Sequence, residues 1–229
     1  MDSSVKFILI LAISFEIAFV KSVPINLVII IGGLAYLLWK RIAVRKLGLL
    51  LVIPLLPAVA TWISFYLNGT GNAVRTAWIM ATRVYAYIVL GGAFSFTATV
   101  ESLLGSLEQN WHLPTKFVYG SLGAFYFIPR VKTAVQQIKT AAMMRGEVLH
   151  VWSPTIFFKA ILLSLRWSDN LAIAMHSHGF SENQTRTHYQ TYAIPRWNWG
   201  VAVGTFLALQ VLVLSLIHIS EPTRRSYIS

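Results

Sequence analysis

The chain has 229 residues, of which 56% are hydrophobic and only 12% are charged, and its formal net charge is +11. A soluble domain carries about 25% charged residues, so this composition favours an integral membrane protein. Cysteine is absent, which excludes disulfides, thiolate metal sites and cysteine nucleophiles.

Four apolar segments in the first 96 residues predict membrane crossings, at 5–21, 25–39, 47–67 and 76–96. The first two are short, because a crossing needs about 20 residues. Cations crowd the loop from Lys40 to Lys46, so the positive-inside rule places this loop and the amino terminus in the cytoplasm. Pro54 and Pro57 are expected to kink the third segment.

Two charged residues, Glu16 and Arg83, fall inside predicted crossings. A charge within the bilayer is costly and is by default functional. The predicted topology puts both residues in the outer half of the membrane on antiparallel crossings, so we expect an intramembrane pair. The alternative is that each side chain snorkels separately toward the lipid headgroups.

From residue 97 to 195 charges recur regularly and the continuous apolar runs stop. Helical periodicity predicts a short helix at 100–109, a long one at 114–145 with a kink at Pro129, and another at 155–177. A polar loop precedes a last apolar segment at 197–213. The predicted fold is an all-α polytopic membrane helix bundle of about five spans. Its parts are transmembrane helices in 1–96, an amphipathic coupling domain in 97–195 and a last transmembrane helix in 196–213.

The final stretch, residues 214–229, is predicted not to be native. From Leu214 to Arg224 it resembles an in-frame translation of a transposase sequencing adapter, so the native chain is expected to continue differently beyond about Val213. The alternative is a native polar tail.

Two amphipathic segments end in a similar way, at Met144-Arg145-Gly146 and at Ser177-His178-Gly179. A glycine commonly follows a helix because it adopts a left-handed conformation at little cost, and a basic residue in the last turn complements the helix dipole. Capping alone explains one such end well, but it explains two similar ends less well. His176 and His178 are spaced wrongly for one metal site, and no metal ligands are predicted.

With these motifs the chain resembles the transmembrane (T) component of energy-coupling factor transporters, in the cobalt, biotin and thiamine permease family. The resemblance covers about residues 5–213 and is strongest over 97–180. Family members carry a Phe-Ile-Pro element, here Phe127-Ile128-Pro129, and two Ala-Arg-Gly motifs at the ends of coupling helices. These motifs fall on Met144-Arg145-Gly146 and Ser177-His178-Gly179.

The resemblance implies a coupling subunit in a prokaryotic inner membrane, without catalytic residues of its own. Two partner ATPase subunits would bind ATP and magnesium, and a small membrane protein would bind the vitamin or metal ion. Nucleic acid is not an expected partner, and the chain itself is expected to hold no cofactor, because it carries no P-loop motif. His178 stands where the family has arginine, so the second contact is expected to be weaker, pH-sensitive or matched to an altered groove.

Two other functions stay open from the sequence. A conventional permease subunit that binds substrate itself would need a polar cavity at the membrane midplane. The predicted spans offer few polar groups for one beyond Glu16, Thr61, Ser64 and Arg83. A polytopic membrane enzyme would need clustered acids or histidines near one membrane face, and the whole chain has only eight acidic residues.

Overall fold

The computed structural model describes residues 2–220, apart from residues 70, 151, 182–183 and 185–186, and side chains as far as Ser215. Every regular element in this part of the chain is an α-helix, which confirms the predicted all-α bundle. The helices are α1 (Ser3–Phe19), α2 (Val23–Trp39), α3 (Val44–Val52), α4 (Leu55–Asn68), α5 (Ala73–Ser95), α6 (Val100–Trp111), α7 (Thr115–Met143), α8 (Pro154–Ser177) and α9 (Arg196–Ser220).

The helices group into two compact units. The first runs to Ser106 and resumes at Tyr192, and the second is Leu107–Thr191. The first unit therefore contains α1–α5, most of α6 and α9, whereas the second contains α7 and α8. The predicted coupling domain at 97–195 overlaps the second unit but also includes the part of α6 that packs with the first.

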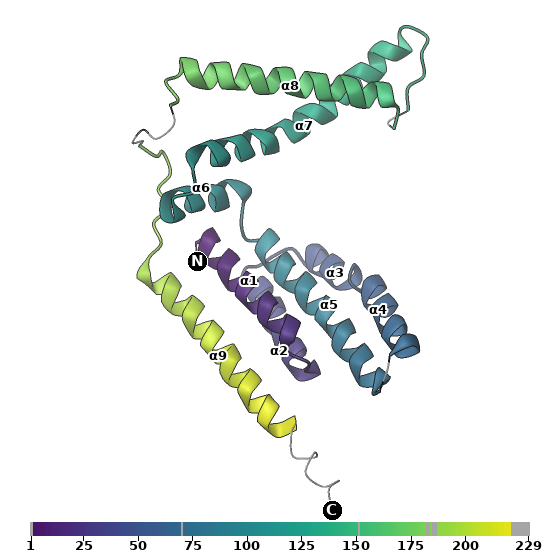
Figure 1. The fold of residues 1–229 in the computed structure, drawn as a ribbon, viewed down its shortest axis with the longest axis vertical. Coiled ribbons are helices and arrows are strands. Elements are labelled where there is room, and N and C mark those ends of the chain that lie inside the picture. Colours follow the sequence, from purple (N-terminus) through teal and green to yellow (C-terminus); the bar gives the residue numbers. More distant parts are fainter. Residues whose placement is uncertain (1, 70, 151, 182–183, 185–186, 221–229) are drawn as a thin grey trace, which may run out of the picture. The chain divides into compact units, whose positions relative to one another are not determined.

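Helix α5 is the centre of the first unit. It contacts α1 and α2 on one side and α3 and α4 on the other (Figure 1). One buried cluster packs Ile17, Ile25, Ala86 and Leu90 against the inner face of α9. A second buried cluster contains Leu37 of α2 and Val89 of α5. Small residues let α2 approach α5 closely, because a Cβ at Gly33 would lie only 2.5 Å from Val89 Cγ1.

Among the residues that the structure describes, three segments are long and apolar enough to cross a membrane, all in the first unit: Val44–Asn68, Ala73–Ser95 and Arg196–Ser215. Helix α2 is apolar but shorter. Large apolar side chains point away from the bundle on these helices, including Leu56 at 78% exposed and Leu207 at 57%. Such a surface suits lipid and not water. The first unit is therefore that of an integral membrane protein.

Prolines shape the crossing that contains α3 and α4. The segment at 47–67, expected to kink, divides into two helices at Ile53 and Pro54. Pro54 has no amide hydrogen to continue the helical ladder, but its carbonyl accepts the amide of Ala58 at 2.9 Å and so begins the next helix. In contrast, α7 is one helix from Thr115 to Met143, with Pro129 inside it.

The second unit is an antiparallel pair of helices. Ring and side-chain contacts join Gly123 to Leu171 and Phe127 to Trp167, so residue numbers fall along α8 as they rise along α7. The aromatic pair has its centroids 6.0 Å apart. Further along, Val131 and Val135 share a cavity wall with residues from Ile156 to Leu165. We call this pair the α7–α8 hairpin.

Candidate functional site

The end of α7 forms a Schellman motif centred on Gly146. This glycine has a positive φ of 78°. The amide of Glu147 donates to the carbonyl of Ala142 at 3.0 Å, and the amide of Gly146 donates to that of Met143 at 3.0 Å. These two bonds satisfy carbonyls that a helix end would otherwise leave free, and the glycine accepts the left-handed backbone that they require.

The end of α8 repeats this geometry around Gly179. Its φ is 79°. The amide of Phe180 donates to the carbonyl of Met175 at 2.8 Å, and the amide of Gly179 donates to that of His176 at 3.0 Å. The two predicted motifs are therefore equivalent in backbone structure. In each, the basic residue, Arg145 or His178, immediately precedes the left-handed glycine.

The two ends differ in what surrounds them. Arg145 lies in an exposed turn beside Met144, which is 84% exposed, and no other described residue holds its guanidinium by a hydrogen bond or ion pair. His178 is also exposed, but it stands at the edge of a cavity. The first end therefore presents a free cation next to an apolar tip, whereas the second presents an imidazole beside a hollow.

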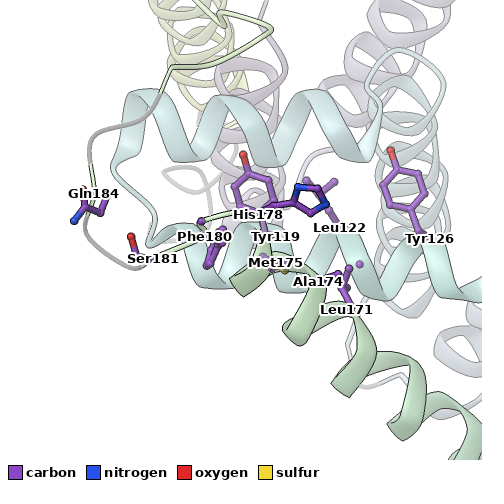
Figure 2. Close-up of a pocket in the computed structure, with 12 residues that line it drawn as sticks. Tyr119, Leu122, Tyr126, Leu171, Ala174, Met175, His178, Phe180, Ser181 and Gln184 are labelled. Carbon is purple, nitrogen blue, oxygen red and sulfur yellow. The ribbon is translucent and has the colours of Figure 1, made fainter.

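The hollow beside His178 has a volume of about 710 Å³ and lies between α7 and the end of α8 (Figure 2). Tyr119 and Tyr126 of α7 line it, together with Leu171 and Phe180. The rings of Tyr119 and Phe180 meet edge to face with centroids 5.7 Å apart, which attaches the chain after Gly179 to the start of α7.

The hairpin separates the two helix ends. Since Phe180 contacts Tyr119, the second end lies level with the first turns of α7. Arg145 lies 26 residues after Tyr119, just past the other end of α7. At 1.5 Å per residue the two ends are about 40 Å apart along α7. The α7–α8 hairpin thus carries two similar helix ends at its opposite extremes.

The lining of the cavity was missed from the sequence. Tyr119, Leu122 and Tyr126 recur at the three- and four-residue spacing of one helix face, which was the available signal. That spacing shows which residues share a face. It does not show that the end of α8 covers this face, because the pairing depends on the antiparallel return of the chain.

The predicted pair of Glu16 and Arg83 needs correction. Both carboxylate oxygens of Glu16 are buried without a hydrogen-bond partner, and Arg83 donates to the Val20 carbonyl at 2.9 Å and to the Met80 sulfur at 3.7 Å. The carbonyl of Val20 lies just past the end of α1, where backbone acceptors are free. Arg83 therefore binds the end of α1, and Glu16 does not hold it.

A different polar residue joins two helices of the first unit. Asn26 of α2 is fully buried, and its amide donates to the Ile79 carbonyl at 3.2 Å and to the Thr82 hydroxyl at 3.0 Å. These bonds fix α2 against α5. Within the part of the chain that the structure describes, no three His, Asp or Glu side chains gather where they could hold a metal ion.

A family model described as "Cobalt transport protein", CbiQ, matches residues 3–189. The match covers α1 to α8 and includes both glycine-ended helices. No curated protein matches the chain at a significant level. The match agrees with the family that the motifs predicted and with the membrane character of the first unit, and it makes the chain a transporter component and not an enzyme. The chain belongs to the CbiQ family, the transmembrane components of energy-coupling factor transporters.

Proposed function

We propose that this protein is the coupling subunit of an ATP-driven importer, and that its two glycine-ended helices each contact one ATPase subunit. The observation that carries the proposal is the repetition of one Schellman geometry, at Gly146 and Gly179, on opposite ends of a single hairpin. Two equivalent contacts on one subunit suit a pair of ATPase subunits, as the family resemblance implies.

The mechanism follows from the rigidity of the hairpin. Closure of two ATPase subunits would displace the two helix ends relative to each other, and packed helices transmit such a displacement as a rigid-body rotation. The contacts at Phe127–Trp167 and Gly123–Leu171 hold α7 and α8 together along their length. A movement at either end would then reach the membrane helices and, through them, a separate substrate-binding membrane subunit.

The substrate in this proposal is a metal ion or a vitamin, with cobalt favoured by the family description. The ATP and magnesium belong to the ATPase subunits. We place the assembly in a prokaryotic inner membrane with the amino terminus of this chain in the cytoplasm. The basic loop between α2 and α3 supports that orientation.

The test reverses one charge at the better-exposed helix end. Arg145→Glu should reduce ATPase co-purification and cobalt uptake at least tenfold, because a charge-assisted hydrogen bond becomes a repulsion. Lys132→Glu is the matched control, since Lys132 is an exposed cation on the same helix. Co-purification and uptake that stay at wild-type levels in Arg145→Glu would disprove the assignment of that helix end.

A further inference from the structure

A cavity of about 420 Å³ in the first unit has the features of a lipid site. The start of α1, the ends of α2 and α5 and the start of α9 all meet around it, so it opens at one end of the transmembrane helices. Its deeper wall is apolar and includes Ile10, Ile13, Leu90 and Val201. Ile13 lies seven residues beyond Lys6, which corresponds to about 10 Å of depth along α1.

The charges at the mouth of this cavity are all positive. Among its described lining residues the charged ones are Lys6 and Lys40. The Lys6 ammonium donates one hydrogen bond, to the Thr97 carbonyl at 3.2 Å, and an ammonium has three donors. Two N–H groups of Lys6 are therefore left for an anion. Asn198, a polar residue only 7% exposed, also lines the cavity.

The residue that follows Lys40 has an uncommon backbone conformation. Arg41 has a φ of 53°, in the left-handed region where glycine is normally found, and its amide donates to the Leu38 carbonyl at 2.9 Å. A residue with a side chain costs about 1–2 kcal/mol more than glycine in this conformation. The helix end thus carries a second cation directly beside Lys40, although glycine would be more stable there.

Aromatic residues mark the same level as a membrane interface. Tyr36, Trp39 and Trp197 line the cavity, and Trp and Tyr are enriched where lipid headgroups meet the hydrocarbon. The Lys40 ammonium lies 5.8 Å from the centroid of the Trp39 ring. This contact holds the charge near the mouth of the cavity by a cation–π interaction.

We propose that this cavity binds one anionic phospholipid, with an acyl chain between α1, α5 and α9 and the phosphate between Lys6 and Lys40. The apolar depth recognises the chain, and the paired lysines select a net negative headgroup over a zwitterionic one. Basic pockets between transmembrane helices bind anionic headgroups for the same electrostatic reason. The positive-inside rule assigns this lipid to the cytoplasmic leaflet.

The experiment measures lipid binding to the full chain, purified in a neutral detergent, by native mass spectrometry with added phosphatidylglycerol or phosphatidylcholine. Phosphatidylglycerol should bind at least tenfold more tightly. Lys40→Gln should weaken its binding about fivefold and Lys6→Gln/Lys40→Gln about 25-fold, from the usual contribution of each lysine near an anionic headgroup. Because Lys40 is exposed, its single variant should fold as the wild type does.

Two further arms separate a lipid site from its alternatives. Lys46→Gln, in the first turn of α3 and outside the cavity lining, should change binding less than twofold. Val201→Trp should fill the apolar wall and weaken binding with the lysines intact, and glycerol phosphate should not compete. Equal binding of the two lipids, an equal loss in Lys46→Gln, or competition by glycerol phosphate would each overturn the proposal.

Discussion

Gly146 and Gly179 each hold a left-handed backbone conformation at the end of a helix, and the next amide closes the turn. Neither glycine has a neighbour within 4 Å of the place where a Cβ would stand. The requirement for glycine is therefore conformational and not one of space. Gly120, within α7, also has open space around it but has helical backbone. Alanine substitutions at Gly146 and Gly120 therefore differ only in the backbone conformation that the new Cβ must accept.

We expect Gly146→Ala and Gly120→Ala to have opposite effects. Alanine at 146 should cost about 1–2 kcal/mol, because a Cβ disfavours the left-handed region, and the Glu147 amide should exchange with solvent roughly 5–30-fold faster. Alanine at 120 should stabilise α7 by about 0.5–1 kcal/mol. Hydrogen exchange read by mass spectrometry checks both values. Unchanged exchange around residue 147 would show that the Schellman turn does not depend on its glycine.

The basic residues of the two motifs differ more than their backbones do. The Arg145 guanidinium offers a planar set of five donors, whereas the His178 imidazole has only two ring nitrogens. The structure adds that His178 lines a hollow together with Tyr119 and Tyr126. A partner at this end that inserts a side chain there would compensate for the smaller number of donors.

At the scale of the elements, α2 and α5 of the first unit approach each other closely. A Cβ at Gly33 would lie 2.5 Å from Val89 Cγ1, and Val89 is fully buried with a stiff, branched side chain. Its neighbour Gly32 has no atom within 4 Å of the same position. Small residues at helix contacts are the usual means of close packing within membranes.

Gly33→Ala should therefore destabilise the bundle by about 1–3 kcal/mol through overpacking, whereas Gly32→Ala should be neutral or slightly stabilising. Thermal unfolding in detergent measures both changes. Adding Val89→Ala to Gly33→Ala should recover part of the loss, since it removes the atom that clashes. A Gly33→Ala variant as stable as Gly32→Ala would show that the two helices separate at no cost.

Much of the secondary structure could be predicted from the sequence, and what could not be predicted has a physical reason. Apolar length and helical periodicity predicted α5, α7 and α8 nearly to their ends, because both signals are local. The pairing of Glu16 with Arg83 was wrong because depth in the membrane does not fix the rotation of a helix about its axis. That rotation is set by packing, and here it brings Arg83 to the end of α1.

At the two helix-end motifs, likewise, local structure could be predicted from the sequence and tertiary contacts could not. Their sequences predicted glycine-capped ends, and the backbone of each confirms it. The hollow beside His178 arises from contacts between residues as distant as Tyr119 and Phe180, and no local pattern reports such a contact. The family resemblance could be predicted from the order of several motifs along the chain, because that order is a property of the sequence alone.

At the scale of the whole molecule, the chain joins a lipid-facing unit to a hairpin whose two ends are built alike. The arrangement has a consequence that does not depend on the strength of either contact. If each end of the hairpin contacts an ATPase subunit, the two ends contact different ATPase subunits, because about 40 Å of α7 separates them. A subunit that merely bound one ATPase through both motifs would need them close together.

The absence of cysteine makes this consequence testable with site-specific cross-linking. In the reconstituted transporter, Met144→Cys, which is exposed and leaves Arg145 in place, and Ser177→Cys should each cross-link to one ATPase subunit. The reaction uses a short thiol-reactive linker and a single reactive cysteine in the ATPase groove. The double variant should then yield a product that contains this chain and two ATPase subunits. Lys132→Cys, on the same helix as Arg145 but away from both ends, should give no product. A double variant that never exceeds one ATPase per chain, while both single variants react fully, would mean that the two ends compete for one partner.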